Sequence, residues 1–165
     1  MGITEDLAAI AKQERELVLP GFNEEIAWAL GSRLRDLAIA KKFSVVLDVR
    51  RFGHPLFYCA LAGTTPDNPE WVRRKGNVVA RFHRSSYAIG LELQQSGKTI
   101  AEKYGLSEAD YAVHGGSFPM RVSAAGIIGS VTVSGVPQRS DHELVVEALC
   151  VLLKRDYAEL RLPTD

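Results

Sequence analysis

The chain has 165 residues, of which 46% are hydrophobic and 24% are charged, and its 20 Lys and Arg residues equal its 20 Asp and Glu residues. This length suits a single domain spanning residues 1–165, with enough chain to bury a sizeable core. The zero net charge argues against bulk binding to nucleic acid or an anionic membrane, which usually needs a basic excess, and it does little to resist self-association.

The first part of the chain predicts two helices followed by a hairpin of strands. Residues 3–16 have the spacing of a short amphipathic helix. Asn23 can cap a second helix over residues 24–42, which has acids in its first turn and lysines at its end. Residues 43–50 and 55–62 are rich in β-branched and aromatic side chains, and a tight link joins them. We expect these two segments to pair as an antiparallel hairpin.

The middle of the chain predicts one long helix. Pro69 suits the first turn of a helix that we expect to run to about Gln95, with a buried stripe of apolar side chains. Residues 96–117 are irregular, with a short helical turn expected around residues 107–111.

The last part predicts a second hairpin and a final helix. Residues 119–124 and 127–134 form the expected strands, and Gly129 inside the second strand indicates a bulge or a close approach by another group. Ser140 followed by Glu143 is the pattern of a capping box at the start of the last helix. The order of elements predicts an α+β fold, a three-layer α/β/α sandwich on an antiparallel sheet.

The cysteines and the N-terminal residues favour a cytoplasmic location. Cys59 and Cys150 do not form a Cys-x-x-Cys pair and stand among apolar residues, so we interpret both as buried free thiols. Residues 1–15 lack the apolar region of a signal peptide. No apolar run approaches the roughly 20 residues that span a bilayer.

The first candidate site is a basic face on the predicted long helix. Its members recur at i, i+4, i+8 and i+11: Arg73, Asn77, Arg81 and Arg84. His83 borders this stripe. Arginines so placed can clamp a carboxylate or a phosphate. The alternative is a solvated face, or one paired with acids elsewhere in the fold.

The second candidate is the segment His114-Gly115-Gly116 and the residues that follow it. Paired glycines allow positive φ and let backbone N–H groups approach a ligand closely. His114 is a candidate ligand, a candidate acid or base, or a side chain bonded to the backbone. The alternative is a plain turn that enters the next strand.

The third candidate is the loop that leads from Ser134 through Gln138 to Asp141 and His142. A loop entering a helix N-terminus is a natural place for an anion. The helix dipole should keep His142 neutral unless Asp141 compensates, and a neutral imidazole is the form that binds metals and haem iron. The alternative is helix capping alone.

Together, residues 76–90, 111–121 and 126–145 resemble the haem-degrading-domain family, which includes GlcG, HbpS and the C-terminal domain of PduO. The specific feature is the combination of HGGSFP, starting at His114, with VSGVPQ followed two residues later by Asp141-His142. The similarity covers most of the chain from about Phe43 and is greatest to the UPF branch of stand-alone proteins of this size.

The resemblance implies a profilin- or PAS-like sheet flanked by helices and assembly into homo-oligomers, dimers or larger rings. Some relatives bind haem, which needs an axial donor, apolar walls and cations for its propionates. The axial candidates are His83, His114 and His142. The full set of candidate ligand-binding residues is Arg81, His83, Arg84, His114, Gly115, Gly116, Phe118, Gln138, Asp141 and His142.

Our leading interpretation is a small-ligand-binding domain, with haem or a related tetrapyrrole as the named candidate and no demonstrated catalysis. The first alternative is a non-catalytic assembly protein in which Arg81, His114 and Asp141 organise a subunit interface. The second is an enzyme acting on a small anionic metabolite. In that case His114 or His142 would be the acid or base, and the backbone of residues 115–116 would hold an oxyanion.

Overall fold

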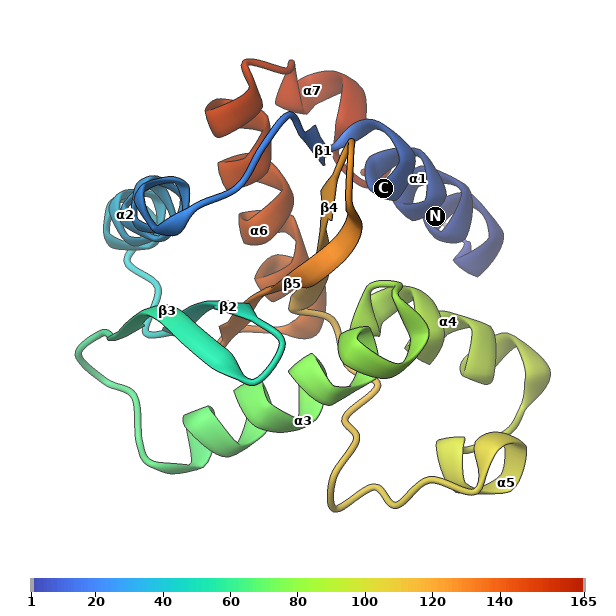
Figure 1. Cartoon of the computed structure of the whole chain (residues 1–165). Coiled ribbons are helices and arrows are strands. Elements are labelled where there is room, and N and C mark those ends of the chain that lie inside the picture. Colours follow the sequence, from blue (N-terminus) through green and yellow to red (C-terminus); the bar gives the residue numbers. More distant parts are fainter. Residues whose placement is uncertain (1, 165) are drawn as a thin grey trace.

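A computed structural model describes residues 2–164 and is built on a five-stranded sheet in the order β1-β4-β5-β2-β3 (Figure 1). The strands are β1 (Val18–Leu19), β2 (Val46–Arg51), β3 (His54–Ala60), β4 (Ser117–Val122) and β5 (Gly126–Ser134). All neighbours pair antiparallel except β1, which pairs parallel with β4. Both predicted hairpins are confirmed, whereas the short strand β1 was not expected.

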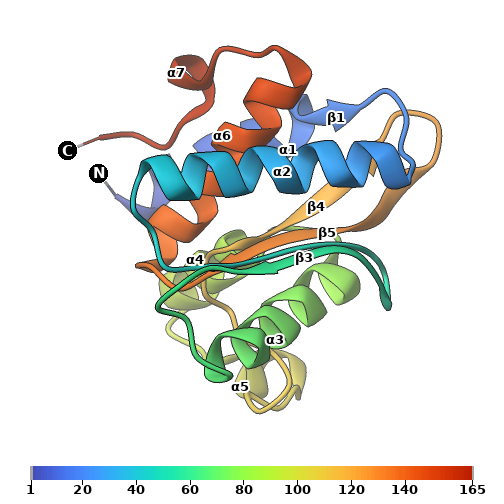
Figure 2. The same cartoon turned by 90° about the vertical axis from the view of Figure 1, so that its left-hand side faces the viewer.

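Helices cover both faces of the sheet, which confirms the three-layer α+β prediction (Figure 2). The layer on one side consists of α2 (Glu24–Ala40) and α6 (Gln138–Leu153). The opposite face is covered by α3 (Asp67–Phe82) and α4 (Ser86–Ser96), and α5 (Ile100–Tyr104) packs against these two helices from outside. At one side of the sandwich, α1 (Ile3–Glu16) packs against α4 and α7 (Tyr157–Leu160).

The main core lies between the sheet and the layer formed by α2 and α6. In α2, Leu30 and Leu34 are fully buried one turn apart, and the predicted cap is present because Asn23 accepts a hydrogen bond from the Ile26 N–H at 2.9 Å. Strand residues such as Leu47 and Phe118 meet this layer from the sheet. A smaller cluster around Ile10 fastens α1 to α4.

The prediction of one long helix is wrong, because the segment is divided into α3 and α4. His83 ends α3 in the left-handed region at φ 54°, and the Ser85 hydroxyl caps α4 by accepting from the Ala88 N–H. A serine that caps a new helix competes with continuation of the old one. Arg84 therefore does not share a helical face with Arg81.

Other local predictions also need correction. Helix α6 begins at Gln138, after Pro137, so Ser140 is not its cap and the capping box is wrong. Helix α5 was not expected, whereas the helical turn predicted around residues 107–111 is confirmed, because the Asp110 and Tyr111 N–H groups both donate to the Ser107 carbonyl oxygen. Cys150 is buried as predicted, but Cys59 is only half-buried.

The expectation for Gly129 is confirmed. A Cβ at this position would collide with the Arg50 carbonyl oxygen of the neighbouring strand. The pairing of β4 with β5 shifts register between Met120, which is opposite Gly129, and Arg121. The glycine thus allows a close approach of β2 beside an irregularity in the sheet.

Candidate functional site

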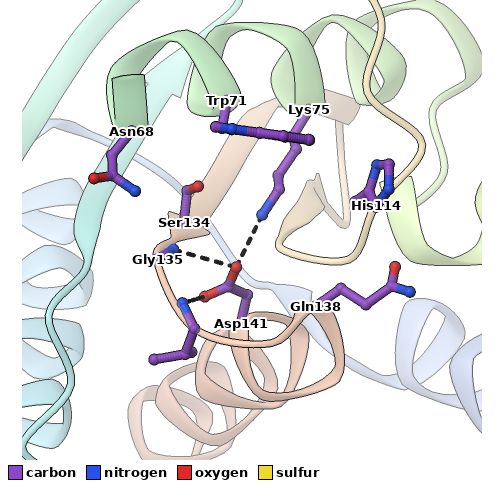
Figure 3. Close-up of a pocket in the computed structure, with 9 residues that line it drawn as sticks. Asn68, Trp71, Lys75, His114, Ser134, Gly135, Gln138 and Asp141 are labelled. Atoms are coloured by element: carbon purple, nitrogen blue, oxygen red, sulfur yellow. Dashed lines mark hydrogen bonds and ion pairs between the residues drawn. The ribbon is translucent and has the colours of Figure 1, made fainter. Parts of the chain in front are cut away.

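A pocket of about 260 Å³ opens where the first turns of α3 face the loop between β5 and α6 (Figure 3). It is lined by Asn68, Trp71, Lys75, His114, Ser134, Gly135, Val136, Gln138 and Asp141. Three of these side chains, from Asn68, Trp71 and Lys75, follow one another on one face of α3 at three- and four-residue spacing. In the structure, the second and third candidate segments therefore line one pocket together with a face of α3. The sequence did not indicate this face as part of a site.

A buried ion pair forms the floor of this pocket. Lys75 Nζ donates to Asp141 Oδ2 at 2.9 Å and to the Val133 carbonyl oxygen at 3.2 Å. The two side chains are only 4% and 2% exposed. Burial lowers the pKa of Lys75 and raises the pKa of Asp141, because removing water penalises both charges, while their mutual attraction acts in the opposite direction.

Asp141 also occupies the anion-binding position of its own loop. Its carboxylate accepts from the Val136 N–H at 3.1 Å and, more weakly, from the Gly135 N–H at 3.4 Å. These are N–H groups of the loop that the sequence predicted as a place for an anion. The protein's own carboxylate therefore takes the role that we had assigned there to a ligand.

The paired glycines leave space for this ion pair. Gly116 has φ 140°, and a Cβ there would crowd Lys75 Nζ and collide with the Val133 carbonyl oxygen. The Gly115 N–H donates to Gln138 Oε1 at 3.0 Å. Gly116 thus has the predicted positive φ, but its backbone approaches the Lys75 side chain and not a ligand.

His114 is the histidine of the pocket. Its exposed ring meets the Trp71 indole edge-on, with the ring centroids 5.2 Å apart. Partial burial, followed by the positive charges of Lys75 and Arg74, lowers the pKa of His114. A neutral imidazole at the mouth of the pocket can donate or accept a hydrogen bond.

His142 faces the interior and is fully buried. Its Nε2 lies 2.7 Å from Gln13 Oε1, and Gln13 Nε2 donates to the Leu160 carbonyl oxygen at 2.7 Å. Gln13 Oε1 is therefore the acceptor, so Nε2 bears the proton of a neutral ring. Burial, with a smaller contribution from Arg139, lowers the pKa of His142 to about 3. The ring is neutral as predicted, but burial rather than the helix dipole is the main cause.

Phe118 is 1% exposed and lies beside His142, with ring centroids 5.8 Å apart. Its place is in the main core and not in the pocket wall. Arg81 lies outside the pocket as well, in a shallow depression with Asn77 and Tyr111.

His83 and Arg84 line a second cleft of about 490 Å³ together with residues of α1 and β4. Its arginines come from separate elements: Arg15 from α1, Arg84 from the link between α3 and α4, and Arg121 from β4. The exposed His83 ring stacks on Phe52 with centroids 5.7 Å apart and planes 9° apart. Three guanidinium groups and one imidazole thus gather at this surface.

Glu14 provides a negative charge in this cleft. Its carboxylate accepts from the Ser85 N–H, and Oε2 lies 3.7 Å from Arg84. Arg84 also pairs with Glu92. Burial raises the pKa of Glu14. The acids hold Arg84 in place, so Arg15 and Arg121 are the cations that face the cleft from its other sides.

Sequence reasoning missed Lys75, Trp71 and Asn68 in the first pocket, and Arg15 and Arg121 in the cleft. One pattern could have revealed Lys75. It stands three residues after Val72 and three before Val78, inside the apolar stripe that predicts the buried face of the helix. A lysine in such a stripe needs a buried partner.

No group of three or more His, Cys, Asp or Glu side chains in residues 2–164 is arranged to hold a metal ion. In the same part of the chain, no helix has the length and apolarity needed to cross a membrane.

The sequence model of the family described as haem degrading protein HbpS-like matches residues 22–150. The chain belongs to this HbpS-like family. UPF0303 proteins of Burkholderia mallei are 62% identical over 162 residues, which is 98% of each chain. The UPF0303 protein of Acidobacterium capsulatum is 60% identical over 163 residues, or 99% of each chain.

Solved structures show the same HbpS-like fold. The crystal structure of Ybr137w protein superposes with a TM-score of 0.84 at 27% identity, covering 90% of this chain and 87% of that one. The crystal structure of the PduOC:Heme complex superposes with a TM-score of 0.67 at 15% identity, covering 79% of this chain and 94% of that one. The latter similarity supports the fold alone.

Proposed function

We propose that this HbpS-like chain is a small-ligand-binding domain that binds haem or a related tetrapyrrole in the cleft at His83. The family description and the haem complex of a structural neighbour make haem the ligand to test. The observation that carries the proposal is the gathering of His83 with Arg15, Arg84 and Arg121 in one cleft.

The two hollows differ in how well they fit haem. The Lys75 pocket, at about 260 Å³, is smaller than the range of about 300 to 1,000 Å³ typical of drug-sized ligands, and its floor is an ion pair. The cleft, at about 490 Å³, has more room. It offers the exposed imidazole of His83 as an axial donor and guanidinium groups for the propionates.

The other predicted axial donors are less suitable. The ring of His142 is fully buried and its Nε2 is engaged by Gln13. His114 is exposed but belongs to the smaller pocket. The arginine stems and Ala11 provide the apolar surface of the cleft. Haem bound there would supply a redox-active iron centre whose potential depends on its ligands and surroundings.

The test is a hemin titration followed by the Soret band, with His83→Ala and His114→Ala compared with the wild type. We expect a saturable transition at one hemin per chain that is lost in His83→Ala and retained in His114→Ala. Arg121→Gln should weaken binding without abolishing the band shift, since it removes one cation and leaves the iron donor. Equal, unsaturable binding in all the proteins would refute the proposal.

Self-assembly is a second candidate property, and one surface favours it. Strand β3 is at the edge of the sheet and contains Tyr58, which is 51% exposed, and the neighbouring helix α2 contains Trp28, which is 63% exposed. Large exposed aromatic side chains at a strand edge favour contact with a second copy. Asp141, which the alternative of an assembly protein placed at an interface, is instead 2% exposed.

Light scattering of the wild type and of a Trp28→Ser, Tyr58→Ser double variant tests this surface. We expect the wild type to have a mass above that of one chain and the variant to have a lower mass. A wild type that is monomeric at high concentration would exclude self-assembly through this edge.

A further inference from the structure

The pocket at Lys75 has a surplus of hydrogen-bond donors. Asn68 Oδ1 already accepts from the Thr65 N–H at 2.9 Å, which fixes the orientation of the amide. Its NH2 group is the end turned toward Ser134 and Gly135 (Figure 3). Asn68 therefore offers the pocket a donor and not an acceptor.

Two more donors face the same space. The Lys75 ammonium has three N–H groups, of which Asp141 and the Val133 carbonyl oxygen take two. The third is left for a group in the pocket that Lys75 lines. The Ser134 side chain projects from the end of β5 toward α3, between Asn68 and Trp71 (Figure 3).

The acceptors of the pocket are largely occupied. Asp141 Oδ1 accepts from the Val136 N–H, and Oδ2 accepts from Lys75 and, weakly, from the Gly135 N–H. Gln138 Oε1 accepts from the Gly115 N–H. A ligand that matches this lining must therefore bring its own acceptor oxygens.

Charge and shape narrow the ligand further. The charge of Asp141 is balanced by Lys75, and the Arg74 guanidinium lies 4.6 Å from the centre of the Trp71 ring. The Asp67 carboxylate accepts from the Trp71 indole N–H at 3.2 Å, so a negative ligand is favoured by the free donors of the pocket and not by its net charge. The flat Trp71 indole forms one wall, and the volume of about 260 Å³ limits the ligand to a few heavy atoms beyond its polar group.

We infer that this pocket binds a small carboxylate. Its oxygens accept hydrogen bonds from Asn68 Nδ2, Ser134 Oγ and Lys75 Nζ, while its carbon skeleton lies against Trp71. The site is separate from the cleft at His83, so its test is independent of haem binding.

Intrinsic fluorescence provides a direct readout. The chain has two tryptophans, and Trp28 is exposed on α2, away from this pocket. In a Trp28→Phe background, Trp71 is therefore the sole reporter. Acetate and benzoate are the probes, with acetamide and benzamide as neutral controls of the same shape. We expect a saturable change with the carboxylates and a response at least about tenfold weaker with the amides, because charge-assisted hydrogen bonds are the stronger ones.

The Asn68→Asp variant tests the donor role of the Asn68 amide while leaving the fold intact. The new carboxylate can still accept from the Thr65 N–H, and an acid suits the first turn of α3. It removes the NH2 donor and adds a negative charge, so carboxylate affinity should fall by about tenfold or more. Lys75 is left unchanged because its removal would strand the buried Asp141.

Asn23→Asp is the matched control, since Asn23 also accepts a backbone N–H at a helix start but lies at the cap of α2. It should bind the carboxylates like the parent. Three outcomes would overturn the inference: no saturable response to acetate or benzoate, equal responses to the carboxylates and the amides, or equal affinities in the two Asn→Asp variants.

Discussion

Two groups of polar residues in this chain contain similar side chains but differ in their surroundings. One group is buried and bonded within the protein, and the other is exposed around a cleft. The buried group consists of Lys75, Asp141 and His142, whose side chains are at most 4% exposed and are hydrogen-bonded to other parts of the protein. The cleft group is Arg15, His83 and Arg121. Their side chains reach solvent from three separate elements around one hollow.

The difference shows that residue type does not separate a structural polar group from a ligand-binding one. A buried charge must be paired by the protein itself, so its role in the fold comes first. An exposed charge costs little to leave in water and stays available to a ligand. The pocket at Lys75 lies between these cases, since its floor is structural and its walls offer unused donors.

The sharpest test of this division is the stability of Lys75→Met. Removing the ammonium leaves Asp141 buried without its cation, which should lower the free energy of unfolding by about 3 to 5 kcal/mol. Arg121→Met in the cleft group should change it by less than about 0.5 kcal/mol. Urea denaturation of both variants measures the difference.

A double variant provides the control for this effect. Lys75→Met with Asp141→Asn removes both charges and keeps a side-chain oxygen for the Val136 N–H. It should be more stable than Lys75→Met alone. If Lys75→Met and Arg121→Met cost the same, the division into two groups is wrong.

The next effect is the pH dependence that His142 produces. Its pKa is about 3 in the folded protein, against about 6.5 in an unfolded chain. Above pH 6.5 the ring is neutral in both states and contributes no pH dependence. As the pH falls from 6.5 toward 3, the unfolded chain gains a proton that the folded protein does not. Stability is then lost at about 1.4 kcal/mol for each pH unit.

Urea denaturation at several pH values checks this slope against His142→Gln, which cannot titrate. The difference in unfolding free energy between the two proteins should change with pH over this window and be constant above it. A difference that is independent of pH would mean that His142 is not a buried neutral group.

The smallest expected effect concerns His114, which is exposed but stands beside the buried pair. Its pKa should lie below 6.5, because of partial burial and the charges of Lys75 and Arg74. NMR titration of the ring proton measures it directly. In Arg74→Gln the pKa should move back toward 6.5, and a wild-type pKa at or above 6.5 would contradict the described surroundings.

The parts of the fold that follow local patterns could be predicted from the sequence. For helix α1, the Asn23 cap and both hairpins, the spacing of apolar and polar residues fits only one type of secondary structure. The break at His83 was missed because apolar side chains continue past it, so only the Ser85 cap marks the new helix. The pairing of β1 depends on residues about a hundred positions away, which no local pattern contains.

The candidate site was predicted in part for the same reason. His114, Gln138 and Asp141 were found because their loops have glycines and a helix start nearby. Their partner Lys75 was hidden in an apolar stripe on a helix 66 residues before Asp141. The sequence placed His83 and Arg84 correctly as neighbours, but only the fold brings Arg15 and Arg121 to them.

The bonds of Gln13 have a consequence for the order in which the chain folds during synthesis. Its side chain joins His142, 129 residues later, and Leu160, 147 residues later. Helix α1 leaves the ribosome first, but the groups that satisfy its buried amide leave last. Helix α1 can pack against α4 earlier, but its buried Gln13 amide is satisfied only after nearly the whole chain has been translated. The end of translation, rather than its beginning, completes this side of the molecule.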